Sequence, residues 1–257
     1  MIGILFTARL GSSRLPQKHL KEVYNKTFME WLVLRFITRF RSEIDNNEVK
    51  LIVATSDEAI NKKFEEVLAP YDVSVFYGDL SNIPMRHLKC ADFNGLDYII
   101  SIDGDDILCS TEAAYAIYKG FVEHPEKDMI SVYGLPLGMN SSGYKVSYLR
   151  KSLAESNPDV AEVGWGRIFV NPDKMEIKVG EWDIYDKLRF TLDYDDDAAF
   201  FAEVIKYLKE EVLNISDEKL ISVVQQQRFD EINSHLFDIY WDNYNSLKES
   251  ENQNEQQ

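Results

Sequence analysis

Short apolar segments recur along the chain and alternate with segments in which apolar residues return every three or four positions. The uninterrupted apolar segments predict five strands, at residues 2–6, 51–54, 73–77, 98–102 and 129–133. The segments with helical spacing predict four helices, at residues 28–40, 58–68, 83–93 and 112–123. Strands that are apolar throughout and alternate with amphipathic helices are typical of a parallel sheet covered on both faces. The first half of the chain therefore predicts an α/β fold.

This alternation breaks between residues 135 and 186, where Gly, Pro, Asn and Ser recur and only short elements are expected. We interpret this segment as an excursion from the main sheet. Residues 188–192 predict a strand that returns to the sheet, and three C-terminal helices are expected at residues 198–209, 217–227 and 235–247. Residues 246–257 are almost entirely polar and predict a disordered tail, so residues 1–245 are expected to form one domain.

Charge is divided unevenly along the chain. Of its 257 residues, 28 are Lys or Arg and 44 are Asp or Glu, which gives a net charge of −16. The first 50 residues nevertheless hold nine basic and five acidic side chains. The overall negative charge argues against nucleic acid and anionic membranes as partners, whereas a local cationic segment suits a small polyanion.

Cysteine use and hydropathy indicate the compartment in which the protein works. Cys90 and Cys109 lie in or beside apolar segments and are too few for a disulfide framework, so a reduced setting is expected. No apolar segment approaches the ~20 residues that a membrane-spanning helix needs. Both observations favour a cytoplasmic protein that does not insert into a membrane.

The cationic residues of the N-terminal segment gather in one loop, TARLGSSRLPQKHL, which follows the first predicted strand. In an open α/β sheet, ligands bind beyond the carboxyl ends of the strands, where this loop lies. The small residues 11–13 let backbone N–H groups approach an anion, and Arg9, Arg14 and Lys18 add cationic arms that suit a triphosphate. The loop matches neither the P-loop nor the dinucleotide-binding pattern. A solvated basic turn is the alternative interpretation on composition alone.

Three carboxylates, Asp103, Asp105 and Asp106, follow the strand predicted at residues 98–102. Carboxylates this close repel one another unless a cation lies among them, and Mg²⁺ held by carboxylates and phosphate oxygens is a usual arrangement. An acid-capped helix N-terminus is the structural alternative, with Ser110 as another candidate cap. Asp103-Gly104-Asp105 is also the DxD pattern of glycosyltransferases that use nucleotide sugars, which keeps that class of enzyme open.

The pattern ARxxSxRLPxK, at residues 8–18, resembles the signature loop of the sugar cytidylyltransferases, which include the 3-deoxy-manno-octulosonate, acylneuraminate and spore-coat-polysaccharide enzymes. Gly104-Asp105 and the later Asp193 are similar to the two positions at which this family holds Mg²⁺. The stretches LPLG and EVGWGRIFVNPD resemble the spore-coat type most closely. The resemblance implies a Rossmann-like, mostly parallel sheet with helices on both faces, of the GT-A-like nucleotidyltransferase kind.

The resemblance also implies roles for individual residues. The nucleotide-binding residues would be Thr7, Ala8, Arg9, Gly11, Ser12, Arg14, Lys18 and Arg86. The catalytic residues would be Lys18, Arg14 and Asp105, and the ligands of Mg²⁺ would be Asp105 and Asp193. The acceptor pocket would include Asp103, Trp165 and Arg167. The segment 135–186 would contribute to this pocket and to the contact of a homodimer.

Together these implications predict a Mg²⁺-dependent cytidylyltransferase. It would transfer CMP from CTP to an acidic sugar, or to an acceptor with a phosphate or phosphonate group, and release pyrophosphate. The expected context is the biosynthesis of a surface polysaccharide or glycoconjugate. Two departures from the family pattern bear on this prediction, because Ile107 replaces a proline and Glu162-Val163 replaces Glu-His. A DxD glycosyltransferase and a noncatalytic nucleotide-binding relative therefore stay open as alternatives.

Overall fold

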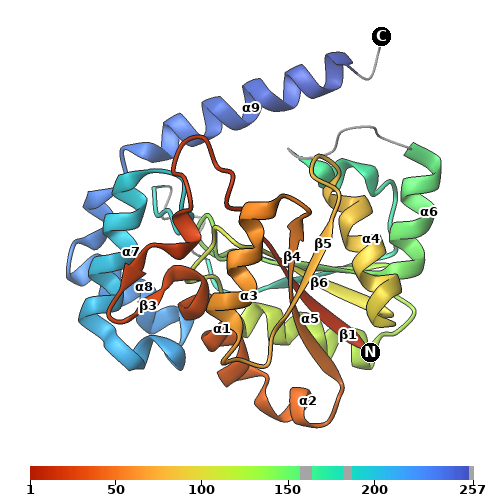
Figure 1. Ribbon diagram of the computed structural model, residues 1–257, viewed down its shortest axis with the longest axis horizontal. Helices are drawn as coiled ribbons and strands as arrows, with labels where there is room; N and C mark the ends of the chain where they lie inside the picture. Colours follow the sequence, from red (N-terminus) through yellow and green to blue (C-terminus); the bar gives the residue numbers. More distant parts are fainter. Residues whose placement is uncertain (157–163, 182–186, 255–257) are drawn as a thin grey trace.

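The computed structural model describes residues 1–156, 164–181 and 187–254. Its centre is a seven-stranded sheet with the strand order β5-β4-β1-β6-β8-β7-β9 (Figure 1). The parallel strands of the first half are β1 (Ile2–Thr7), β4 (Val49–Ser56), β5 (Ser74–Gly78) and β6 (Tyr98–Asp103). The other strands are β7 (Met129–Tyr133), β8 (Ser142–Lys145) and β9 (Lys174–Lys178). β8 runs antiparallel between β6 and β7, and β9 pairs in parallel with β7.

Helices cover both faces of this sheet. They are α1 (Phe28–Arg39), α2 (Arg41–Asp45), α3 (Lys63–Leu68), α4 (Ile83–Asn94), α5 (Thr111–Glu123), α6 (Val146–Ser156), α7 (Asp195–Leu208), α8 (Asp217–Gln226) and α9 (Leu236–Asn254). Shorter elements are the strands β2 (Glu22–Val23) and β3 (Lys26–Thr27) and the 3-10 helices η1 (Lys18–Leu20), η2 (Ala59–Lys62), η3 (Trp165–Ile168), η5 (Lys209–Leu213) and η6 (Phe229–Ile232). One core cluster includes residues of α1, α3, α5, α7 and α8, and a second includes residues of α4 and α6.

Successive side chains of the central strands enter opposite layers of the molecule. In β1, Ile4 and Phe6 pack in the first core cluster, whereas Leu5 packs in the second, and all three are fully buried. Because successive residues of a strand point to opposite faces, burial on both faces requires an apolar residue at every position. The expected α/β fold, with a mostly parallel sheet between helical layers, is confirmed.

The segment 135–186 departs from the expected excursion, because it returns to the main sheet twice. It contributes β8 and β9 to that sheet and forms α6 between them. β8 is four residues long and includes a glycine, which is too short for a periodic signal. β9 alternates exposed and half-buried residues at the sheet edge. Residues 157–163 and 182–186 of this segment lie outside the described residues.

Residues 188–192 do not form the expected strand. The segment is buried but makes only one isolated bridge, between Arg189 and Leu137. The N–H groups of Phe190 and Leu192 donate to the carbonyl oxygens of Leu137 and Asp105 respectively. Both acceptors lie in loops, so the apolar pattern of the segment reflects burial beside these loops rather than pairing with a strand.

At the C-terminus, α9 continues to Asn254 and includes residues 246–254, for which the sequence predicted disorder. Extending a nucleated helix costs little, and this stretch has no Gly or Pro to end it. Residues 255–257 lie outside the described part of the chain. None of the described helices combines the length and apolar character that crossing a lipid bilayer requires.

Candidate active site

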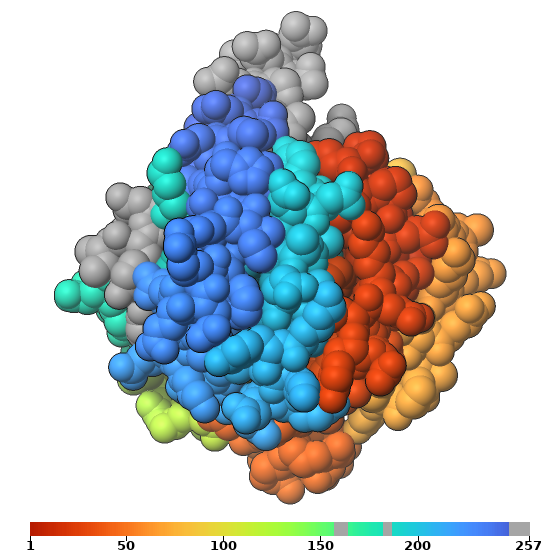
Figure 2. Space-filling view, turned by 90° about the vertical axis from the view of Figure 1, so that its left-hand side faces the viewer, coloured from red at the N-terminus to blue at the C-terminus, as the bar shows by residue number. Residues whose placement is uncertain are grey.

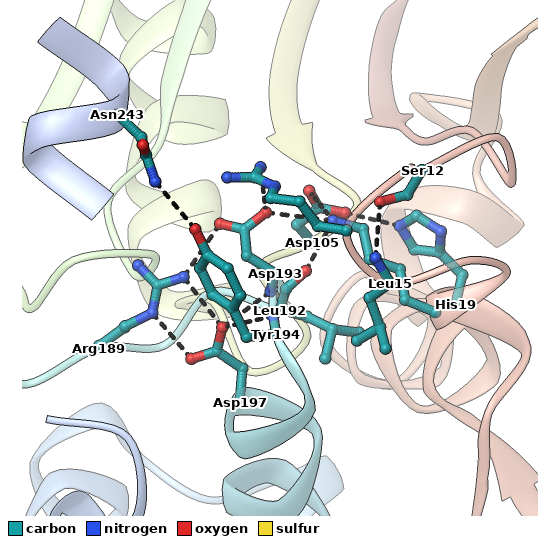
Figure 3. A network of polar contacts seen from close by, with 12 residues as sticks. Ser12, Leu15, His19, Asp105, Arg189, Leu192, Asp193, Tyr194, Asp197 and Asn243 are labelled. Atoms are coloured by element: carbon teal, nitrogen blue, oxygen red, sulfur yellow. Dashed lines mark hydrogen bonds and ion pairs between the residues drawn. The ribbon is translucent and has the colours of Figure 1, made fainter. Parts of the chain in front are cut away.

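Three segments meet at the carboxyl ends of β1 and β6. They are the loop after β1, the loop after β6 and the segment that precedes α7. The Gly104 N–H donates to the carbonyl oxygen of Thr7 over 2.8 Å, which fastens the end of β6 to the end of β1. Position 104 has no room for a side chain, because a Cβ there would lie 2.6 Å from the Cβ of Ala8. The Leu192 N–H donates to the carbonyl oxygen of Asp105, also over 2.8 Å. This contact brings the segment that precedes α7 to the same place (Figure 3).

Lys18 lies between the two carboxylates that the sequence predicted to hold a metal ion. Its Nζ is 2.6 Å from Asp105 Oδ2 and 3.3 Å from Asp193 Oδ1, and it donates to the carbonyl oxygen of Leu192. Only 4% of Lys18 is exposed. Burial disfavours the ammonium charge, but Asp105 and Asp193 outweigh burial and raise the pKa of Lys18 above its ordinary value. The loop and the two strand-end acids therefore meet in one charged cluster.

Asp193 is held from two sides. Arg14 Nη2 donates to its Oδ1 over 2.7 Å, and Arg189 Nη2 donates to its Oδ2 over 3.0 Å. Arg189 also bonds both carboxylate oxygens of Asp197. Asp197 accepts the backbone N–H groups of Asp193 and Tyr194 and thereby fixes the turn before α7. Asp197 and Asp193 thus have different roles. Asp197 caps α7, whereas Asp193 lines the cleft.

His19 is a site residue that the sequence analysis did not single out. It lies next to Lys18 in η1, and its ring nitrogen Nε2 is 2.8 Å from Asp105 Oδ1. Burial opposes ionisation of Asp105, but Lys18 and then His19 outweigh burial and hold the pKa of Asp105 below its ordinary value. Because an ionised carboxylate only accepts hydrogen bonds, Nε2 is the donor in this contact.

A cleft of about 540 Å³ contains this cluster. The predicted site residues that line it are Thr7, Ala8, Arg9, Ser12, Arg14, Lys18, Arg86, Asp103, Asp105, Trp165 and Asp193. Two predicted residues, Gly11 and Arg167, are not part of its described lining. Gly11 lies at the outer side of the loop beside the carboxylate of Glu58, and Arg167 lies in η3.

Arg86 and Trp165 line the cleft but also pack into its walls. Arg86 is 2% exposed, and its guanidinium group donates to the carbonyl oxygens of Asp79, Ala54 and Leu80. It therefore holds the loop after β5 and adds positive charge to the cleft wall. The Trp165 ring meets the ring of His87 edge-on at 5.4 Å, which places it on the α4 side of the cleft.

The cationic loop is shaped by side chains as well as by its own sequence. The Leu10 N–H donates over 2.9 Å to the amide oxygen of Asn61, which is fully buried. The Asn61 amide group in turn donates to the backbone of Ser56 at the end of β4. Within the loop, the Ser12 hydroxyl oxygen accepts the Leu15 N–H over 3.3 Å. The loop is therefore held in a defined shape, which favours anion binding by its cationic side chains.

The acids that follow β6 do not cap α5. Ser110 does so, because its hydroxyl oxygen accepts the Ala113 N–H over 2.8 Å. Asp103, Asp105 and Asp106 line the cleft instead. Desolvation within the cleft, together with repulsion from Asp105 and Asp193, raises the pKa of Asp103 to about 6. This cluster holds more carboxylates than its cations pair with, which favours a further cation.

The carboxylates of the cleft match the requirements of Mg²⁺ only when phosphate oxygens complete the ligand set. Within residues 1–156, 164–181 and 187–254, no group of three His, Cys, Asp or Glu side chains is arranged to hold a metal ion. Asp105 and Asp193 do converge on one cation, the ammonium group of Lys18. Two carboxylates with phosphate oxygens as the remaining ligands suit Mg²⁺, so the donor set fits this ion in the presence of a nucleotide.

Comparison with known proteins decides the family. A sequence profile described as cytidylyltransferase matches residues 3–255. The chain belongs to the cytidylyltransferase family. It is therefore a nucleotidyltransferase, and the reaction of its family is the transfer of CMP from CTP. The enzyme class predicted from the sequence is confirmed.

Individual relatives of this cytidylyltransferase are distant. An uncharacterized protein of Methanocaldococcus jannaschii is 25% identical over 246 residues, which are 92% of this chain and 95% of that protein. The structure of a cytidylyltransferase from Leptospira borgpetersenii has a TM-score of 0.74 at 22% identity, and covers 89% of this chain and 95% of its own. A CMP:2-keto-3-deoxy-manno-octonic acid synthetase complexed with CTP has a TM-score of 0.56 at 13% identity, covering 80% and 98%. At these identities the structural likeness shows the shared fold.

Several cleft residues of this cytidylyltransferase were not predicted from its sequence. They are His19, Thr191, Tyr240, Asn243 and Tyr244. Arg189 was also missed, although it holds the carboxylate of Asp193. His19 and Arg189 lie close in sequence to predicted residues, but no residue pattern distinguished them. The only sign in α9 was a row of aromatic residues at helical spacing, which is equally typical of packing.

Proposed function

We propose that this cytidylyltransferase is Mg²⁺-dependent and transfers CMP from CTP to an acidic sugar or to an acceptor bearing a phosphate or phosphonate group. The proposed context is the synthesis of a surface polysaccharide or glycoconjugate. The observation that carries the proposal is the meeting of Lys18, Asp105 and Asp193 in a cleft bordered by a preshaped cationic loop. A triphosphate and a divalent cation are the ligands that match these two sets of charges.

The loop residues would bind and orient the nucleotide. The base would lie toward Thr7 and Ala8 at the end of β1, and the triphosphate would lie along Ser12, Arg14 and Lys18. Asp105 and Asp193 would hold Mg²⁺, which when bound supplies charge neutralisation at the α-phosphate. Lys18 would then exchange part of its carboxylate contacts for phosphate oxygens.

The reaction would be a direct displacement at the α-phosphorus. An acceptor oxygen forms the new O–P bond while the bond to the β-phosphate oxygen breaks, and the acceptor proton passes to solvent. Pyrophosphate leaves with the electron pair of the broken bond. Lys18 and Arg14 would stabilise the charge that develops on this leaving group. The homodimer that the family resemblance implies is part of this proposal.

The test is pyrophosphate release from CTP in the presence of Mg²⁺ and a panel of acceptors. The panel holds 3-deoxy-manno-octulosonate, N-acetylneuraminate, ribitol 5-phosphate and 2-aminoethylphosphonate. We expect Lys18→Met and Asp105→Asn to lower kcat by on the order of 10²-fold or more. Lys21→Met is the matched control, because Lys21 lies in the same segment, is exposed and pairs with the exposed Asp195.

Two outcomes would contradict the proposal. The first is turnover that does not change when Mg²⁺ is removed with EDTA, and the second is a Lys18→Met enzyme as fast as the Lys21→Met control. Binding of CTP without turnover on any acceptor would favour the noncatalytic relative. Release of UDP or GDP from a nucleotide sugar would favour the DxD glycosyltransferase.

A further inference from the structure

α9 passes beside the N-terminal loop (Figure 1). Tyr240, Asn243 and Tyr244 of this helix line the cleft. Their spacing of three and four residues places the three side chains on one face of the helix. α9 therefore contributes a wall of the active site.

This wall is fastened to the residues around Asp193. The Asn243 side-chain amide donates to the Tyr194 hydroxyl over 3.0 Å (Figure 3). The Arg189 guanidinium group lies 4.9 Å from the centre of the Tyr240 ring and donates to Asp193. Two side-chain contacts thus tie the position of α9 to a carboxylate at the centre of the site.

α9 approaches the cleft at the end away from β5. Leu80, which follows β5, and Leu137, which follows β7, both line the cleft. In the sheet, β5 and β7 are five strand spacings apart, or about 24 Å. Asn233, just before α9, donates to the carbonyl oxygen of Arg189, and Arg189 forms a bridge with Leu137. With the base at Thr7 and Ala8, the α9 end is a part of the cleft that stays open to the acceptor.

The α9 end of the cleft offers aromatic rings, hydroxyl groups and an amide. Its described lining consists of Leu137, Gly138, Thr191, Tyr240, Asn243 and Tyr244, and none of these carries a positive charge. Asp106 lies beside Gly138 and adds a carboxyl group there. Arg14 and Arg189 border this end, but both guanidinium groups are bonded to Asp193. Such a lining suits an uncharged, hydroxyl-bearing ring or chain better than a carboxylate or phosphate.

We propose that this end of the cleft is the acceptor subsite, and that Asn243 and Tyr244 recognise the hydroxyl-bearing, uncharged part of a sugar or polyol acceptor. This inference rests on the proposed function and deepens it, because it assigns the acceptor subsite and the class of molecule it takes. The anionic group of the acceptor points the other way, toward the proposed magnesium–nucleotide complex at the centre of the cleft. Its attacking oxygen is thereby placed beside the phosphates.

The first experiment compares two pairs of matched variants in the full chain. Asn243→Ala is paired with Asn245→Ala, and Tyr244→Ala with Tyr207→Ala, because Asn245 and Tyr207 are exposed outside the cleft lining. With the best acceptor of the panel, we expect both cleft variants to raise the KM for the acceptor at least tenfold. The Kd for CTP in the presence of Mg²⁺, measured by calorimetry, should stay within twofold in all four variants. A Tyr244→Phe variant, which keeps the ring, should recover most of the loss.

The inference is overturned if the cleft variants leave the KM for the acceptor unchanged, or if they weaken CTP binding as much as they raise that KM. The second experiment tests the class of acceptor. Ribitol 5-phosphate and the sugar acids should give kcat/KM values at least tenfold above that of 2-aminoethylphosphonate, whose tail carries an ammonium group and no hydroxyl. The reverse preference would overturn the assigned class. If the unmodified chain turned over no acceptor at all, the proposed function itself would fail, and the inference with it.

Discussion

At the scale of single residues, Lys18 combines structural and chemical roles. It is buried between two carboxylates, and it bridges the N-terminal loop to the loop after β6 and to the segment before α7. Removing one partner of a buried ion pair costs roughly 3–5 kcal/mol, because the remaining charge is left without compensation. The unfolding free energy of any Lys18 variant must therefore be measured together with its kinetics, because lost stability could otherwise be mistaken for lost catalysis.

Arg189 is expected to position Asp193 through the planar geometry of its guanidinium group. It reaches Asp193 and Asp197 together through two separate nitrogen atoms, Nε and Nη2, whereas a lysine would have to reach both carboxylates from one nitrogen atom. We expect Arg189→Lys to weaken the apparent affinity for Mg²⁺ in the presence of CTP by about tenfold, since a hydrogen bond to a charged group contributes roughly 1.5–3 kcal/mol. Calorimetric titration of Mg²⁺ into the protein with CTP measures this change.

The matched control for this prediction is Arg228→Lys. Arg228 is exposed, and its described contact is with Glu231 in η6. Affinity for CTP in EDTA should be similar in both variants, because Arg189 acts on the carboxylate and not on the nucleotide. An unchanged Mg²⁺ affinity in Arg189→Lys would show that Asp193 keeps its position without the guanidinium group.

At the scale of elements, the sequence predicted strands from continuous apolar segments, both where a strand is buried on both faces, as β1 is, and where it lies half-buried at the sheet edge, as β5 does. All five such strands are present, at β1, β4, β5, β6 and β7. The same signal misled at residues 188–192, because burial among loops produces it as well as burial in a sheet. β8 and β9 gave no comparable signal, since one is very short and the other alternates exposed and half-buried residues.

The sequence indicated those residues of the candidate site that lie in, or directly after, a recognisable local pattern. Arg14 and Lys18 belong to the N-terminal loop, and Asp105 and Asp193 follow apolar segments, so local sequence indicated them. His19 and the residues of α9 acquire their places only through contacts between remote segments. His19, for instance, meets an acid 86 residues away in the chain. No pattern within a short window carries that information.

The junction between β1 and β6 depends on the absence of a side chain at Gly104. In Gly104→Ala the new Cβ would lie 2.6 Å from Ala8 Cβ and 2.9 Å from the Thr7 carbonyl oxygen. Because these neighbours are backbone and a Cβ, they cannot rotate away, and we expect a loss of about 1–3 kcal/mol in unfolding free energy. Urea denaturation measures the loss. Gly166→Ala should leave the denaturation midpoint unchanged, since its Cβ would meet nothing within 4 Å, and an equal loss in both variants would contradict this reasoning.

At the scale of the whole molecule, the uneven charge of the chain corresponds to a contact in space. The N-terminal segment lies beside α7 on one face of the protein, with the C-terminal helices next to α7 (Figure 2). Lys21 pairs with Asp195 and Lys26 with Glu210 across this boundary. The pairs of Arg14 and Lys18 with the buried Asp193 continue the same contact into the cleft. The basic start of the chain is therefore matched to acids in its C-terminal third.

The net charge of −16 should make stability depend on ionic strength. Exposed pairs such as Lys21–Asp195 contribute at most about 1 kcal/mol each, so repulsion among the excess acids should dominate the response to salt. We expect the thermal midpoint at pH 7.5 to rise by a few degrees between 10 and 200 mM KCl. Scanning calorimetry measures this rise. Near pH 4.7, where the chain carries no net charge, the rise should vanish, and an equal rise at both pH values would contradict the explanation.

The bond between Lys18 and Asp193 joins residues 175 positions apart, and this separation has a consequence for the nascent chain on the ribosome. At a ribosomal rate of 5–20 residues per second, the second carboxylate follows the lysine by roughly 10 to 35 s. During that interval the amino-terminal loop is already made, but Asp193, the second carboxylate of the proposed magnesium–nucleotide site, has not yet been translated. The nascent chain should therefore not bind CTP with magnesium at this site until about three quarters of the chain has been synthesised.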